Sequence, residues 1–82
     1  MIMEDLCLKI LEQRGIKPTA IRMLVLKAMM ETEQAVSLLD LENKLDTVDK
    51  STIFRTITLF VSHHLAHSVD DGTGSLKYAV CD

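Results

Sequence analysis

Small hydroxyl groups and one arginine recur at helical spacing between residues 49 and 62. At about 100° per residue they share one stripe, which is formed by Ser51, Arg55, Thr58 and Ser62. The opposite face is apolar and consists of Ile53, Ile57 and Phe60, flanked by Val61. Phe54 falls at the edge of the polar stripe. Hydroxyls, a guanidinium and an exposed ring can contact phosphates, base edges and a thymine methyl group, whereas an ordinary amphipathic helix would leave the same stripe solvated.

Histidine and cysteine near the C-terminal end form a second candidate group, since both residue types bind zinc. Alternation along a predicted hairpin puts His67 on the side of Leu65 and Val69, and Cys81 on the other side with Lys77 and Ala79. A shared site would then need a bulge or a twist. We therefore predict no metal site in this chain, and name His67 and Cys81 as weak candidate ligands.

An enzyme reading has little support. The neighbouring carboxylates Asp70 and Asp71 fall in a predicted turn, which they are suited to shape. No glycine-rich phosphate loop precedes a helix, and Ser, His and Asp show no catalytic arrangement. We predict that the protein is not an enzyme.

The elements that must hold these residues are four helices and a hairpin. Helices are expected over residues 3–14, 19–30, 37–44 and 49–63, with Thr19, a Ser37–Asp40 capping box and Asp49 as N-caps. Gly15 is the expected end of the first helix. The second helix should bury a stripe at i, i+3, i+4 and i+7 spacing, made of Ile21, Leu24, Val25, Ala28 and Met29.

After His64 the pattern changes to alternation, which predicts two strands around the turn at residues 71–74. Because a lone hairpin is marginal in water, its Leu, Val and Tyr side chains should lie on the helices. A helix-turn-helix followed by a hairpin describes a winged helix, an α+β and mostly helical fold.

Length and composition fit one small domain over residues 1–82. A net charge of −3 argues against a generic nucleic-acid binder but allows a local basic face. The two cysteines, Cys7 and Cys81, are far apart in sequence, and Cys7 fits a core position. With no apolar run of about 20 residues and no signal segment, a reducing cytoplasm is the expected setting.

The sequence resembles the ferric uptake regulator family of bacterial metal- and peroxide-responsive repressors over about residues 9–81. The resemblance is carried by three motifs in order, RGIKPT with Arg22 three residues on, STIFRTI followed by Leu59 and Phe60, and DDG through Lys77 and Tyr78. It implies that Phe54 and Arg55 face the major groove, Lys17 approaches the minor groove or backbone, and Arg22 supports the phosphate side. Lys77, Ser68 or Thr73 of the wing would rest on the backbone.

The full predicted DNA-binding set joins these residues with the hydroxyls and cations around the two helix starts. It consists of Lys17, Thr19, Arg22, Lys50, Ser51, Thr52, Phe54, Arg55, Thr58 and Lys77. The resemblance implies double-stranded DNA with a pseudo-palindromic operator as the partner. The alternative is a winged helix that binds protein, which the acidic net charge favours.

The sequence departs from the family pattern at several positions. Phe54 replaces the usual tyrosine, the pair His63–His64 occupies a corner where glycine is common, and Ala79 stands where a metal-binding glutamate is expected. The family's second domain, which supplies the dimer interface and most metal ligands, does not follow Asp82. We expect the chain to be a DNA-binding fragment, with a homodimer and zinc or iron belonging to a full-length protein.

Overall fold

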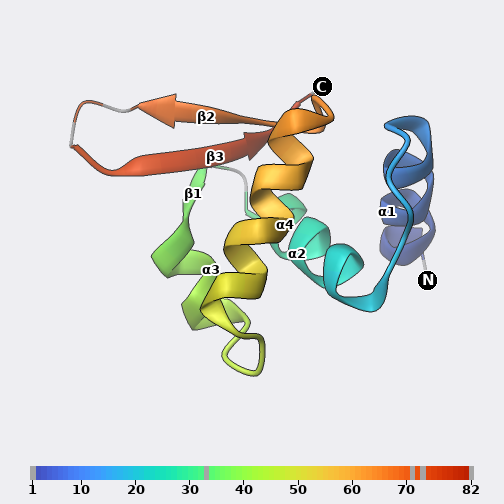
Figure 1. Cartoon of the computed structure of the whole chain (residues 1–82), viewed down its shortest axis with the longest axis horizontal. Helices are drawn as coiled ribbons and strands as arrows, with labels where there is room; N and C mark the ends of the chain where they lie inside the picture. The colour runs from blue at the N-terminus through green and yellow to red at the C-terminus, as the bar shows by residue number, and fades with distance from the viewer. Residues whose placement is uncertain (1, 33, 71, 73, 82) are drawn as a thin grey trace.

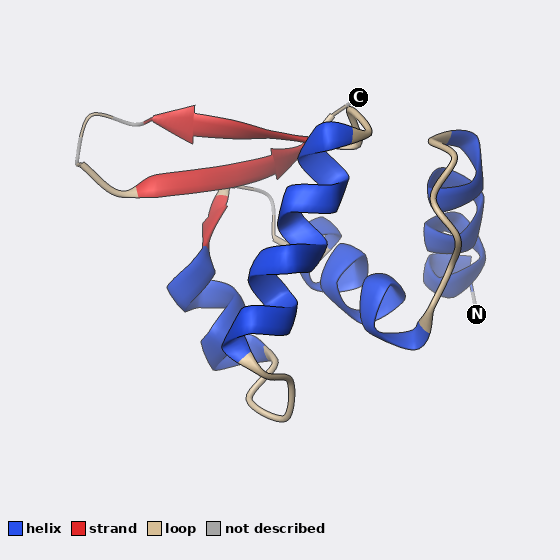
Figure 2. Cartoon of the chain, viewed as in Figure 1, coloured by secondary structure: helices blue, strands red, loops and turns tan. Residues whose placement is uncertain are grey.

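The computed structural model describes residues 2–32, 34–70, 72 and 74–81, with side chains from residue 4 onward. The elements are α1 (Ile2–Gln13), α2 (Ala20–Met30), β1 (Val36–Ser37), α3 (Leu38–Lys44), α4 (Lys50–Ser62), β2 (Ala66–Asp70) and β3 (Leu76–Val80). Helices α2, α3 and α4 form the centre, β2 and β3 project from one side as a wing, and α1 lies at the other edge (Figure 1). The winged helix predicted from the sequence is confirmed (Figure 2).

Three helices begin at the side chains that the sequence predicts as caps. Thr19 Oγ1 accepts a hydrogen bond from the backbone N–H of Arg22 at 3.3 Å, and Asp49 Oδ2 accepts one from Ser51 at 3.0 Å. Ser37 and Asp40 bond each other reciprocally, both at 3.1 Å. Since these bonds satisfy amide groups that a helix start leaves unpaired, they fix where α2, α3 and α4 begin.

Two helix ends use a left-handed residue. Gly15 follows α1 with φ of 72°, and His64 follows α4 with φ of 62°. After α4 the N–H of Leu65 bonds the carbonyl of Phe60 at 2.9 Å, which satisfies one of the last carbonyl groups of the helix. The corner at His64 therefore adopts the glycine-type conformation with a histidine.

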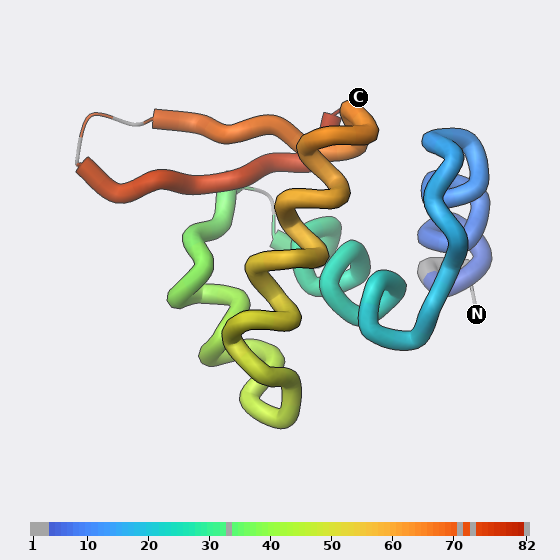
Figure 3. The backbone as a smooth tube through the Cα atoms, in the orientation of Figure 1, coloured from blue at the N-terminus to red at the C-terminus, as the bar shows by residue number. Residues whose placement is uncertain are grey.

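The wing belongs to a three-stranded antiparallel sheet in the order β1-β3-β2. The sequence predicts the hairpin but misses β1, which has two residues and pairs Val36 with Tyr78 and Ser37 with Lys77. A strand this short carries no alternation to recognise. The chain trace shows β1 running from the centre of the molecule up to β3 (Figure 3).

Helix α4 buries the face that the sequence predicts. Ile53, Ile57 and Phe60 are each at most 1% exposed, and the cluster around them includes Cys7 and Leu11 of α1. In α2 the prediction is wrong at one position, because Leu24 is 43% exposed and Leu26 is buried in its place. Helix α2 is contacted by α1, α3 and α4. Its buried surface is therefore wider than one stripe and includes Leu26, but it does not reach Leu24.

The packing face of the wing also differs from the prediction. Tyr78 is buried against the core, but Leu76 is 54% exposed and Val69 is half-buried. The pairing explains the result for Val69, because Ser68 lies opposite Tyr78 whereas Val69 lies opposite Lys77, on the other face of the sheet. Leu76 shares the face of Tyr78 but lies opposite Asp70 at the turn end of the hairpin, where it lines a surface hollow. The turn residues Asp71 and Thr73 lie outside the described residues. Within the described part of the chain, no helix is long and apolar enough to cross a membrane.

Candidate nucleic-acid interface

Helix α4 presents its polar stripe to solvent, as the sequence predicts. Ser51, Arg55, Thr58 and Ser62 are exposed, and Phe54 is 51% exposed beside them. Thr52 is half-buried at the edge of the stripe. The apolar face of α4 packs on the core, which fixes the position and orientation of the polar stripe.

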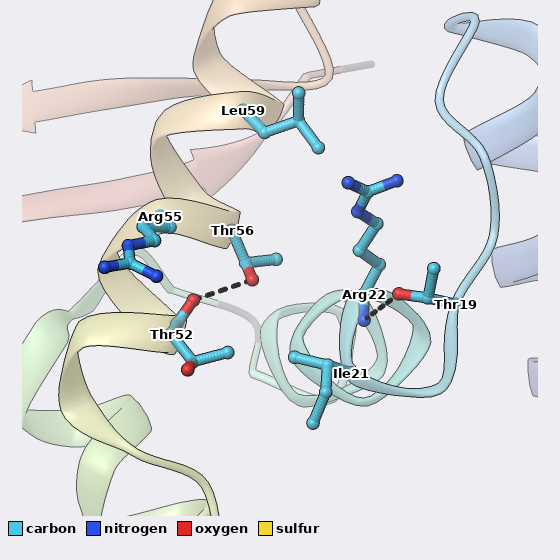
Figure 4. Close-up of a pocket in the computed structure, with 7 residues that line it drawn as sticks. All are labelled: Thr19, Ile21, Arg22, Thr52, Arg55, Thr56 and Leu59. Atoms are coloured by element: carbon cyan, nitrogen blue, oxygen red, sulfur yellow. Dashed lines mark hydrogen bonds between the residues drawn. The ribbon is translucent and has the colours of Figure 1, made fainter.

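A hollow of about 360 Å³ separates α4 from α2. It is lined by residues of both helices, namely Thr19, Ile21, Arg22, Thr52, Arg55, Thr56 and Leu59 (Figure 4). Arg22 donates from Nη1 to the carbonyl oxygen of Lys17 at 2.8 Å, which fixes the guanidinium beside the link that precedes α2. Two arginines from different helices thus border one surface hollow, a suitable arrangement for contacts with a phosphate backbone.

A second hollow of about 350 Å³ lies on the α3 side of α4. Lys50, Ser51, Phe54 and Arg55 line it together with Leu38. Arg55 borders both hollows, with Arg22 of α2 on one side of it and Lys50 of α4 on the other. Most of the predicted DNA-binding residues are brought together here.

Two acidic residues near this face are engaged in capping. Asp49 accepts the bond from Ser51 at the start of α4. Hydrogen bonding from Ser37 lowers the pKa of Asp40, and the nearby charge of Lys77 lowers it further. Lys77 itself is half-buried in β3, where it lies between Ser37 of β1 and Val69 of β2 and close to Asp40 of α3. Lys77 is not among the residues that line the two hollows beside Arg55.

A third hollow, of about 370 Å³, lies between α4 and the wing. Phe54, Thr58 and Ser62 line it from the helix, and Ser68 and Leu76 line it from the strands. Sequence reasoning missed Leu76 as a surface residue because the alternation of β3 assigned it to the core. Ser68 does lie beside α4, so the wing and α4 could contact one DNA molecule together.

His67 and Cys81 lie on the same side of the hairpin, which corrects the sequence prediction. Nδ1 of His67 is 3.2 Å from Sγ of Cys81. The register pairs His67 with Ala79, two residues before Cys81, and the N–H of Cys81 bonds the carbonyl of Leu65 at 2.8 Å. Strand alternation alone could not reveal this, because the relative phase of the two strands depends on the turn.

These two side chains are a pair and not a complete metal centre. Among the described residues, no group of three or more His, Cys, Asp and Glu is placed to hold a metal ion. The predicted absence of a site is not decided by this result, since a pair can contribute to a site that other ligands complete.

Comparison with known proteins shows where this fold recurs. No protein-family model and no curated protein matches the sequence. Among solved structures, the Vibrio cholerae ferric uptake regulator matches with a TM-score of 0.81 at 20% identity, over 92% of this chain and 61% of that chain. The Pseudomonas aeruginosa ferric uptake regulator with manganese matches with a TM-score of 0.78 at 23% identity, over 100% and 62%.

A zinc uptake regulator in complex with zinc and DNA matches with a TM-score of 0.71 at 25% identity, over 99% of this chain and 57% of that chain. The chain thus spans less than two thirds of each of these regulators. Fold, motif order and structural likeness agree: this chain has the winged-helix fold of the N-terminal DNA-binding domain of the ferric uptake regulator family.

Proposed function

We propose that this chain binds double-stranded DNA through α4, as the DNA-binding domain of a transcriptional regulator. The observation that carries the proposal is the exposed stripe of α4, which contains Arg55 and lies beside Arg22 and Lys50. The neighbouring carboxylate of Asp49 serves as the N-cap of the helix. The zinc uptake regulator solved with DNA supports it, since that protein has the same fold. A metal- or peroxide-responsive repressor of pseudo-palindromic operators is the specific role proposed.

The roles of the residues follow from their exposure. Arg55, within the exposed stripe, and Phe54, at its edge, are assigned to base edges, the guanidinium to guanine and the ring to a thymine methyl group. Four residues are assigned to phosphates, namely Ser51 at the start of the stripe and Arg22, Lys50 and Thr52 beside it. Lys17 and Thr19 lie on the approach to α2, where Thr19 already serves as the cap.

Fluorescence anisotropy tests the proposal by measuring the affinity of the chain for two duplexes over a series of salt concentrations. One duplex is selected from a random library for binding to this chain, and the other is its scrambled control. Arg55→Ala should weaken binding and reduce discrimination between the two duplexes. Lys50→Ala should weaken both equally and reduce the salt slope by about 1. Lys9→Ala is the matched control, because Lys9 is exposed on α1 at the far edge from α4 (Figure 1).

Binding of protein is the alternative function, and the net charge of −3 favours it. The same titration separates the two functions. A chain that binds neither duplex at low salt and high protein concentration would contradict the DNA proposal and favour a protein partner.

Binding of a metal ion is a second candidate function, favoured by the 3.2 Å contact between His67 and Cys81. Thiolate and imidazole are zinc ligands, and a tetrahedral site needs two more from elsewhere in a longer protein or from water. Cobalt(II) can replace zinc as a probe: thiolate-to-cobalt absorption should appear with the wild type, persist in Cys7→Ala and disappear in Cys81→Ser. Absorption that survives Cys81→Ser would refute the assignment.

A further inference from the structure

We propose that Thr58 reads a base amino group in the major groove, either N6 of adenine or N4 of cytosine. The inference rests on the proposed DNA binding and adds to it a position of defined chemistry. It arises from the direction of one hydrogen bond inside α4.

The hydroxyl proton of Thr58 is already used by the helix. Oγ1 of Thr58 donates to the carbonyl oxygen of Phe54 at 2.9 Å, while the side chain itself is exposed. A hydroxyl has one proton and two acceptor lone pairs. With the proton directed back to the preceding turn, the oxygen offers lone pairs to a ligand and no donor.

The major groove contains few partners for such an oxygen. Guanine presents N7 and O6 as acceptors, and thymine presents O4, so neither can donate to Thr58. Donors there are the N6 amino group of adenine and the N4 amino group of cytosine. An acceptor that faces guanine O6 or thymine O4 would have to give up its bond to Phe54 or remain unpaired, and both cost binding free energy.

Hydrogen-bonding character therefore changes along α4. Its N-terminal half carries Lys50 and Arg55, which only donate and so suit phosphates and guanine. One turn further on, Thr58 lies in the hollow between α4 and the wing, among Phe54, Ser62 and Leu76, none of which is charged. Close to Thr58, the acceptor oxygen and the exposed ring of Phe54 determine the chemistry of the surface.

Ser62 has similar bonding and provides the matched control. Its Oγ donates to the carbonyl of Leu59 at 2.8 Å, and it is exposed one turn after Thr58. Ser62 is the last residue of α4, whereas Thr58 is one turn closer to the N-terminal half that carries Lys50 and Arg55. Because the N-terminal part of a recognition helix approaches the bases most closely, Thr58 should be within reach and Ser62 beyond it.

Single-atom changes in the DNA test the proposal. In a selected duplex, each adenine is replaced in turn by purine, which lacks the N6 amino group, and each cytosine by 2-pyrimidinone, which lacks N4. At one base in each half-site, the loss of the amino group should weaken wild-type binding by about 3- to 10-fold, as expected for one hydrogen bond. Whether that base is adenine or cytosine identifies the source of the amino group.

The variants attribute this sensitivity to Thr58. Thr58→Val, nearly the same shape without the oxygen, should bind the natural and altered duplexes equally at that base, with helix content checked by circular dichroism. Thr58→Ser and Ser62→Ala should keep the wild-type difference. Sensitivity that survives Thr58→Val, or that disappears only in Ser62→Ala, would overturn the proposal while leaving DNA binding intact. Failure of the wild type to bind any duplex would instead remove the proposed function, and this inference with it.

Discussion

Two threonines of α4 make the same kind of hydrogen bond but differ in their exposure to solvent. Thr56 and Thr58 each donate a hydrogen bond to the carbonyl four residues earlier, at 2.8 and 2.9 Å. Thr56 is 6% exposed, at the floor of the hollow between α4 and α2, whereas Thr58 faces solvent. Helical periodicity predicts that Thr58 lies on the exposed stripe. It does not predict the direction of the hydroxyl bond, which depends on rotamer and local backbone.

The two cysteines make a prediction at the same scale. Cys7 is 1% exposed and burial raises the pKa of its thiol, so little reactive thiolate should be present at neutral pH. Cys81 is half-buried beside His67. An aromatic disulfide reagent should modify Cys81 in the native protein and Cys7 only after denaturant is added, as followed by absorbance. In Cys81→Ser the early phase should be missing; an early phase that remains would place Cys7 outside the core.

At the scale of elements, the sequence predicts best where local chemistry sets the boundary. Thr19, the Ser37–Asp40 box and Asp49 are local signals, and α2, α3 and α4 begin at them. The exposure of Leu24 and the pairing of His67 with Ala79 depend on which elements pack together and on a turn, so residue spacing could not determine them. The hairpin was therefore predictable, but the contact between His67 and Cys81 was not.

Adding or removing a glycine at the two left-handed helix ends should change the stability of the fold in opposite directions. At φ of 62°, His64 adopts a conformation that glycine adopts without strain, and Gly15 has φ of 72°. His64→Gly should raise the free energy of unfolding by roughly 1 kcal/mol, and Gly15→Ala should lower it by a similar amount. A Cβ at Gly15 meets no atom within 4 Å, so the loss there would come from the backbone alone. Urea denaturation measures both; equal stability of His64→Gly and wild type would argue against strain at this corner.

The capping box of α3 predicts a pH dependence. Hydrogen bonding from Ser37 and the charge of Lys77 lower the pKa of Asp40 below its ordinary value of 3.8. A carboxyl with a lowered folded-state pKa stabilises the fold above its unfolded-state pKa, and that stabilisation is lost as pH falls through the folded value. The stability difference between wild type and Asp40→Asn should therefore be constant at neutral pH and shrink below about pH 4. Urea denaturation across pH 2 to 7 tests this, and a difference that grows on acidification would contradict it.

At the scale of the molecule, part of the acidic charge lies away from α4. Three exposed acids, Glu4, Asp5 and Glu12, belong to α1, which lies at the edge opposite the wing (Figure 1). Arg22, Lys50 and Arg55 line the hollows beside α4. A net charge of −3 is therefore compatible with a basic binding face. With so few cations, however, one copy can neutralise only a few phosphates, so its affinity should be modest and should fall only gradually as salt is raised.

Two linked copies should overcome this weakness. If α4 of each copy occupies one half-site of an inverted repeat, the second contact forms at the effective concentration that the linker sets. Two copies joined through a flexible linker long enough to span one helical turn of DNA should bind the inverted repeat about 10²- to 10⁴-fold more tightly than one half-site. The linked protein with Arg55→Ala in one copy should lose most of that gain, whereas Lys9→Ala in one copy should keep it. Anisotropy titrations at fixed salt measure the ratio, and equal affinity for the repeat and the half-site would show that α4 does not read two half-sites in this way.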